Sequence, residues 1–166
     1  MRIDDFMIEA EMTNNARDGW HDDPLVTFDS GEGSGSILSG FSISTDFSRP
    51  VTRSDIFIHD ASPTLSNIYM SSTSMSVPNN DGNFTIEGQS IYLENSDAIL
   101  NDVTIHGNNF LSLNHSVYGS GLLHVKGGAP IFNGLIMRDN AMTRSIEGTF
   151  DVKGGLLHVE DGASVT

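Results

Sequence analysis

The chain has 166 residues, and its 8 lysines and arginines against 22 aspartates and glutamates give a net charge of −14. This length is sufficient for a core of its own, and we expect a single domain over residues 1–166. The acidic balance argues against nucleic acid and anionic membranes as partners, because both bind through cationic surfaces. The chain has no cysteine, which excludes disulfides, thiolate zinc sites and cysteine nucleophiles. No apolar run has the length of a membrane span, so membrane insertion is not expected.

Short runs of alternating apolar and polar residues fill the chain, and this alternation is the period of a β-strand. One six-residue phrase recurs: apolar, polar, then Gly, Asn or Asp, followed by apolar, any and apolar. Its copies begin at Ile3, Leu38, Leu65, Leu100 and Phe132. A unit of this size cannot bury its apolar face alone, so the copies are predicted to stack on one another.

The third position of the phrase predicts a sharp corner between two strands. It is occupied by Asp5, Gly40, Asn67, Asp102 and Gly134. These residue types enter the left-handed backbone region at the lowest cost. One such residue between two extended stretches turns the chain without a long loop.

A second strand phrase precedes the first in the later copies, with two inward apolar residues and a turn of Asp, Asn or Gly. It covers residues 56–61, 91–96, 123–128 and 157–162, with a looser version at 26–31. A weaker closing strand is predicted at Phe84 with Ile86, at Leu111 with Leu113, and at Phe150 with Val152. Residues 75–83, 114–121 and 141–148 are interpreted as loops.

Together these patterns predict an all-β fold, a right-handed parallel β-helix (solenoid) of four to five coils with three short strands per coil. Each strand is expected to pair in parallel with its equivalent one coil away, at about 4.8 Å. Equivalent side chains then form columns along the solenoid.

The phrases of the type Gly-Gly-x-Leu-His-Val, the stretch Ala129 to Gly134 and the Leu-x-Asn-Ile-x-Met corner resemble known β-helix repeats. They are similar to the pectin-lyase-like superfamily, particularly the repeats of polymorphic outer-membrane and other surface β-helix proteins, over Ile3 to Val165. The resemblance implies an extracellular or cell-surface location. It does not select an activity, because this fold hosts lyases, hydrolases, adhesins and tailspikes.

One outward column is predicted to contain Thr27, Phe57, Tyr92, His124 and His158. A row of rings about 4.8 Å apart can stack sugars, so the last four are the predicted ligand-binding residues, with a glycan or surface polymer as the partner. The alternative is a ladder of rings that only stabilises the sheet.

His124 and His158 as neighbours suggest a metal site, which needs a third ligand. Their companions are Lys126 and Glu160, and a lysine disfavours a cation, so no metal is predicted there. Calcium at acidic turns such as Asp22-Asp23 and Asp60 is an alternative to solvated turns, although no calcium-loop motif is present. No other cofactor is expected.

A second column contains Glu9, Ser44, Ser71, His106 and Arg138. Enzymes of the superfamily that cleave acidic polysaccharides need a base and a cation that neutralises a uronate. His106, Arg138 and Asp139 are the candidates for these roles. The polygalacturonase signatures are absent, and the charge of −14 repels a polyanion, which makes catalysis the less favoured interpretation.

The sequence therefore favours a non-enzymatic extracellular or cell-surface β-helix, serving as a structural stalk, an adhesive or a glycan-binding module. The alternative is a fragment of a polysaccharide lyase or hydrolase of pectin-lyase-like type, and a second alternative is a viral tailspike segment. Repeats run from Ile3 to Val165 without a capping segment. Exposed coil ends are an association hazard, so either a longer solenoid or end-to-end homo-oligomers are expected.

Overall fold

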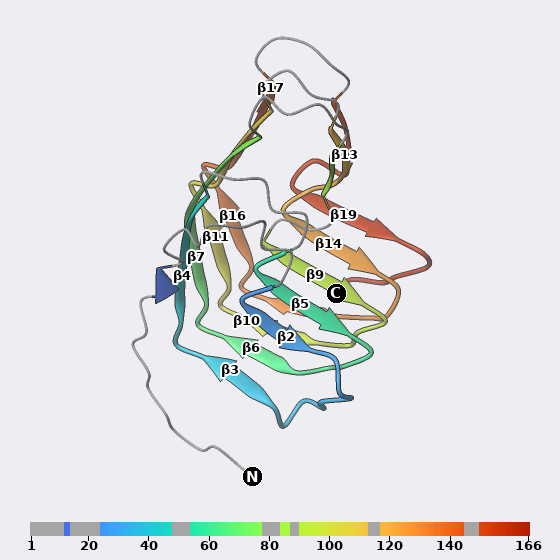
Figure 1. Cartoon of the computed structure of the whole chain (residues 1–166). Coiled ribbons are helices and arrows are strands. Elements are labelled where there is room, and N and C mark those ends of the chain that lie inside the picture. Colours follow the sequence, from blue (N-terminus) through green and yellow to red (C-terminus); the bar gives the residue numbers. More distant parts are fainter. Residues whose placement is uncertain are drawn as a thin grey trace.

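A computed structural model describes residues 12–13, 24–47, 54–77, 84–86, 90–112, 117–144 and 150–166. Among these residues the secondary structure consists of strands alone, and every strand pairing is parallel. The strands stack coil upon coil around one core, as Figure 1 shows. The protein is therefore an all-β parallel β-helix, which confirms the predicted fold class.

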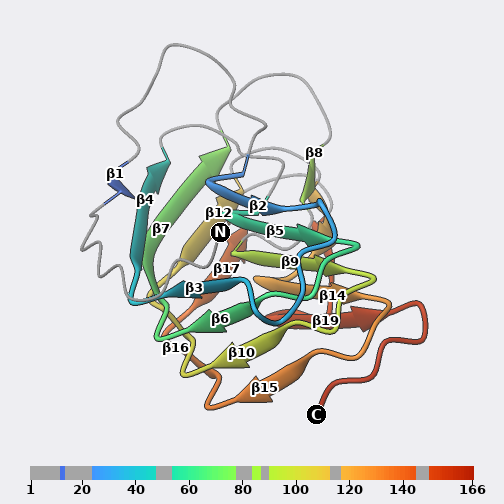
Figure 2. The same cartoon turned by 90° about the horizontal axis from the view of Figure 1, so that it is seen from below.

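Three sheets form the sides of the solenoid. The five-stranded sheet contains β2 (Val26–Phe28), β5 (Ile56–His59), β9 (Ile91–Glu94), β14 (Leu123–Lys126) and β19 (Leu157–Glu160). The four-stranded sheet contains β3 (Ile37–Ser39), β6 (Thr64–Ser66), β10 (Ile99–Asn101) and β15 (Ile131–Asn133), which lie side by side in Figure 2. The seven-stranded sheet contains β1 (Met12–Thr13), β4 (Ser42–Phe47), β7 (Tyr69–Val77), β11 (Thr104–His106), β16 (Ile136–Arg138), β12 (Asn109–Ser112) and β17 (Ala141–Arg144).

A further three-stranded sheet contains β8 (Phe84–Ile86), β13 (Val117–Ser120) and β18 (Phe150–Lys153). Together with β12 and β17 it forms an arm that rises from the solenoid, with β13 and β17 in its upper part in Figure 1. In a complete coil the chain follows β9, β10 and β11 around the core, then β12 outward and β13 back.

The arm corrects two details of the sequence prediction. Leu111 lies in the outgoing strand β12, and the partner of both Phe84 and Phe150 is Val117 in the returning strand β13. The three predicted loops are also partly strand, since they contain the end of β7, β13 and β17. Both errors have one cause: two successive strands of similar alternation look alike in sequence, and only their stacking partners distinguish them.

The predicted corners are confirmed wherever the structure describes them. Gly40, Asn67, Asp102 and Gly134 have φ values of 76°, 52°, 51° and 79°. The amides of Gly40, Asn67 and Asp102 join the ladder as well, and the Asn67 N–H donates to the carbonyl of Asn101 at 3.0 Å. These three corners are thereby held by the next coil. Asp5, Glu9, Asp22, Asp23 and Leu113 lie outside the described residues.

The core is a set of columns of inward aliphatic side chains. Its largest fully buried members are Ile56, Ile58, Leu65, Ile68, Met70, Ile91, Leu93, Leu100, Ile105 and Leu122. Burial is complete in the middle coils and falls in the last one: Val125 is 0% exposed, whereas Val159, its partner in β19, is 37% exposed. Within the described residues no helix is long and apolar enough to cross a membrane.

Candidate functional site

The predicted column of rings exists in the predicted register. Parallel pairing aligns Thr27 with Phe57, Phe57 with Tyr92, Tyr92 with His124, and His124 with His158. The Phe57 and Tyr92 rings stack at 5.3 Å between centroids, Tyr92 and His124 meet edge to face at 4.9 Å, and the two imidazoles stack at 4.7 Å. The sequence therefore placed these side chains correctly relative to one another.

The column is not the solvent-facing platform that the sequence suggested. Tyr92 is only 3% exposed and His124 only 5%, while Phe57 is half-buried. The chain that returns from the arm passes over the rings. Ser120, at the end of β13, hydrogen-bonds His124, and a Cβ on Gly154, just after β18, would lie 2.5 Å from the Cα of His158. Stacking of a sugar on Tyr92 and His124 is prevented in this arrangement.

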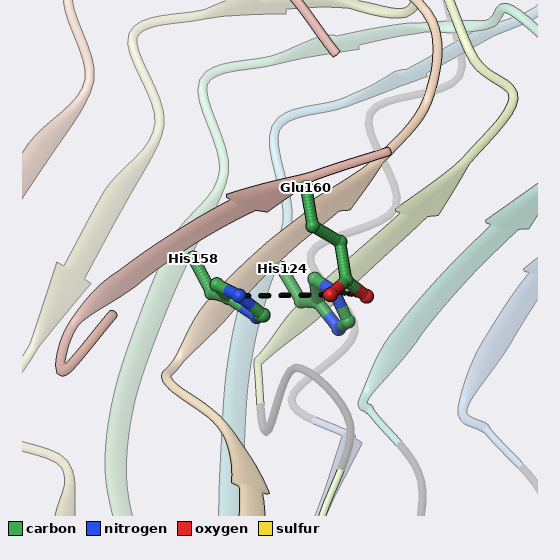
Figure 3. Close-up of side chains that lie close together, drawn as sticks. All are labelled: His124, His158 and Glu160. Atoms are coloured by element: carbon green, nitrogen blue, oxygen red, sulfur yellow. Dashed lines mark hydrogen bonds and ion pairs between the residues drawn. The ribbon is translucent and has the colours of Figure 1, made fainter. Parts of the chain in front are cut away.

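Three side chains converge between β14 and β19, as Figure 3 shows. His124 and His158 belong to the ring column, and Glu160 belongs to the column two residues further along the strands. The Nε2 of His124 lies 2.9 Å from Oε1 of Glu160, and the Nε2 of His158 lies 3.7 Å from Oε2. Ser120 Oγ is 2.8 Å from Nδ1 of His124. The two imidazoles thus share the carboxylate of Glu160 through their Nε2 atoms, and the Ser120 hydroxyl contacts the other nitrogen of His124.

Lys126, which the sequence placed beside this group, is directed away from it. Its Nζ lies 2.8 Å from Oε1 of Glu94, one coil earlier. The hydrogen bond to Glu94, followed by the charges of nearby groups, raises the pKa of the Lys126 amine. Among the described residues, both His124 and His158 lie within 4 Å of the Glu160 carboxylate.

A second constellation lies on the outer face of the seven-stranded sheet. The hydroxyl of Tyr69 is 3.1 Å from Nδ1 of His106, whose Nε2 is 3.1 Å from Oδ2 of Asp139. Arg138 follows His106 in the next coil of the same column and is exposed. The structure thus brings together two of the three residues of the predicted catalytic alternative, His106 and Asp139, with Arg138 adjacent in sequence to Asp139.

Tyr69 is the member of this constellation that the sequence argument missed. The signal was available, because Tyr69 is an outward residue of its corner phrase and pairs with Thr104, two residues before His106 on the same strand. When Asp139 accepts the Nε2 proton, the Nδ1 of His106 is the acceptor for the Tyr69 hydroxyl. Such a chain can hold or withdraw the proton of the tyrosine hydroxyl. Tyr69 is 38% exposed, so its ring is open to a ligand.

A third polar group is buried where the chain enters the five-stranded sheet. Ser54, Asp55 and Ser90 are each at most 3% exposed, and the Oγ of each serine and Oδ2 of Asp55 have no hydrogen-bond partner. Burial raises the pKa of Asp55 from 3.8 to about 8. This position was not predicted from the sequence, and Leu122 occupies it two coils later in the same column.

The acidic turn at Asp60 is engaged within the protein. Asn95 donates to its Oδ1 at 3.1 Å, and its Oδ2 lies 3.4 Å from Nε2 of His59. The predicted calcium alternative stays untested, since the other proposed turn, residues 22–23, lies outside the described residues.

Comparison of the chain with protein-family models, with curated protein sequences and with solved structures found no significant match.

Proposed function

We propose that the protein is an extracellular or cell-surface β-helix of pectin-lyase-like type that serves as a non-enzymatic stalk or adhesive module and binds glycan. We place the glycan on the outer face of the seven-stranded sheet, at Tyr69, His106 and Arg138. In this role the coils either continue into further coils or associate end to end.

The observation that carries the proposal is the exposed ring of Tyr69 stacked on that of His106, with ring centroids 6.2 Å apart and planes at 29°. Arg138 extends this surface by one more coil. Three coils at about 4.8 Å spacing give a row of two rings and a guanidinium roughly 10 Å long. Aromatic rings offer sugars an apolar face, and arginine offers them hydrogen-bond donors.

The charge of the chain indicates which glycans to expect. A net charge of −14 repels polyanions at long range. We therefore expect neutral glycans to bind in plain buffer, and acidic ones to bind only when divalent cations reduce the repulsion.

The hydrogen-bonded chain Tyr69–His106–Asp139 favours a second candidate, a polysaccharide lyase. β-Elimination needs a base that removes a proton next to a uronate and a cation that neutralises the carboxylate. Tyr69, with its proton passed to His106, would take the C5 proton, and Arg138 would neutralise the carboxylate. The C4–O bond would then break, and Tyr69 would pass the proton it has taken to the leaving oxygen. Asp139 would orient the imidazole and stabilise its charged form.

Two substitutions of Tyr69 separate the candidates. Tyr69→Ala removes the ring and is expected to weaken glycan binding by roughly three- to tenfold, whereas Tyr69→Phe keeps the ring and should bind nearly as the wild type does. A lyase gives the opposite pattern in turnover, because Tyr69→Phe would abolish it without loss of binding. Binding is measured by affinity electrophoresis on neutral and acidic polysaccharides, and turnover by ultraviolet absorbance with pectate and alginate, each with calcium and with chelator.

His59→Ala, on the five-stranded sheet, serves as the matched control and should leave both readouts unchanged. Absence of binding to every polysaccharide, or binding that survives Tyr69→Ala intact, would refute glycan recognition at this face. Turnover that disappears in His106→Ala and Arg138→Ala would replace the binding proposal with the lyase.

A further inference from the structure

We propose that His124, His158 and Glu160 form a binding site for a divalent transition-metal ion of the zinc type, located between β14 and β19. This site lies on the five-stranded sheet, apart from the proposed glycan face. It reverses the expectation drawn from the sequence, in which Lys126 beside Glu160 counted against a cation. The structure pairs Glu160 with both histidines and Lys126 with Glu94.

The spacing of the donor atoms suits a single small ion. The donor atoms of the three side chains all lie within 4.8 Å of one another. Two ligands at 2.0–2.1 Å from zinc with tetrahedral angles are separated by about 3.3 Å. The Nε2–Oε1 distance of 2.9 Å for His124 and the Nε2–Oε2 distance of 3.7 Å for His158 lie on either side of this value. The widest pair of donor atoms, up to 4.8 Å apart, has to close to about 3.3 Å to enclose an ion.

Ser120 supplies the outer support that metal-binding histidines commonly have. Its Oγ lies 2.8 Å from Nδ1 of His124. When Nδ1 carries the proton and donates it to the hydroxyl, Nε2 presents its lone pair toward Glu160 and the proposed ion. The 5% exposure of His124 fixes the ring in this orientation.

One ring nitrogen of His158 has no hydrogen-bond partner, and the other is held only loosely by Glu160. Its Nδ1 is buried without a hydrogen-bond partner, and its Nε2 lies beyond hydrogen-bond distance from the Glu160 carboxylate. An imidazole with a 14% exposed side chain in this situation loses the solvation of its nitrogens. Coordination through Nε2 would restore a strong interaction for the ring.

The surrounding charges leave room for a cation. Lys126, the neighbour that argued against one, is paired with Glu94 at 2.8 Å. Glu160 has a side chain exposed by 33%, which gives an ion a path of entry. Two imidazoles and one carboxylate favour zinc-like ions over calcium and magnesium, which prefer oxygen ligands. Three protein ligands also leave a coordination position for water, as in zinc sites that perform chemistry.

The chain contains a matched control. His59 lies in the same sheet, 3.4 Å from Asp60 and 3.9 Å from Glu94, and in the described part of the chain it has carboxylates but no second histidine beside it. His59→Asn should therefore leave zinc binding unchanged. His158→Asn and Glu160→Gln each remove one proposed ligand with little change in volume, and Ser120→Ala removes the outer support alone.

The test is titration of the metal-free full chain with Zn²⁺, and separately with Ca²⁺, by calorimetry, followed by the absorption spectrum of the Co²⁺ form. We expect one Zn²⁺ per chain, no comparable Ca²⁺ binding, and a Co²⁺ absorption spectrum typical of imidazole and carboxylate ligands.

His158→Asn and Glu160→Gln should weaken Zn²⁺ binding by more than about tenfold, and Ser120→Ala by about tenfold. Bound Zn²⁺ should raise the midpoint of thermal unfolding, because it joins β14 to β19.

Circular dichroism of each variant establishes that it is folded, and Glu160→Gln, at a partly exposed position, keeps the test informative if His158→Asn does not fold. The proposal is overturned if the wild type binds no Zn²⁺ or if both ligand variants bind as well as the wild type. An equal loss in His59→Asn would overturn it too, because it would indicate adventitious binding to surface histidines.

Discussion

Asp55 is a carboxyl group that the fold holds in its protonated form. It is 3% exposed, and burial raises its pKa from 3.8 to about 8. In the unfolded chain the same group titrates near its ordinary value of about 3.9. Between these two values the folded state binds one proton more than the unfolded state, so folding opposes ionisation of this residue.

The free energy of unfolding should therefore fall as pH rises from about 4 to about 8, by at most about 1.4 kcal/mol per pH unit from this residue, and level off above that range. Asp55→Asn keeps the shape and cannot ionise, so it should remove this contribution and be more stable relative to the wild type at pH 8 than at pH 4. Urea unfolding of both proteins across this range measures the difference. Asp29→Asn, at an exposed position, is the control. Parallel curves for Asp55→Asn and the wild type would contradict the assignment.

At the scale of the elements, one column of residues with positive φ joins the four-stranded sheet to the seven-stranded sheet. Gly134 turns the chain between β15 and β16 at φ 79°, beside Asp102 of the preceding coil. A Cβ on Gly134 would lie 2.7 Å from Oδ1 of Asp102, the end of a side chain that can move. Asn67 and Asp102 occupy the same corner position in other coils with positive φ.

Gly134→Val should destabilise the protein by about 1–3 kcal/mol, because a β-branched residue resists this backbone conformation. Gly134→Asn should cost considerably less, since asparagine is already used in this column. Denaturant unfolding of the two variants gives the comparison. Similar losses in both would mean that contact with Asp102, rather than backbone conformation, decides the cost.

The register of the strands could be predicted from the sequence, whereas the packing of the arm over the ring column could not. Period-two alternation fixes which face a residue occupies, and the repeated phrase fixes its register, so the ring column and the corners followed from the sequence. The covering of Tyr92 and His124 did not, because it depends on how the chain returns from the arm. Gly121 is the residue in the sequence that indicates this close return of the chain. A Cβ at this position would collide with the backbone carbonyl of Gly155. The convergence of Glu160 on two histidines likewise depends on side-chain direction, which spacing does not specify.

For the whole molecule, burial depends on position along the solenoid axis. Val125 and Val159 are neighbours in one inward column, 0% and 37% exposed respectively. Val125→Ala should cost about 2 kcal/mol, as the sum of lost burial and a residual cavity, and Val159→Ala less than half of that. Equilibrium unfolding at two protein concentrations measures both costs. An equal cost that appears only at the higher concentration would mean that another copy covers the last coil.

The parallel pairing of every described strand with its equivalent in the next coil makes the solenoid nearly one-dimensional, because a coil is held mainly by the coils directly above and below it. Opening then proceeds inward from either end, one layer at a time, without a single rupture of the entire core. Backbone amides of β9 and β10 would be the last to exchange with deuterated solvent, and those of β19 among the first. A metal ion bound between β14 and β19 would slow the opening of the coil that contains β19.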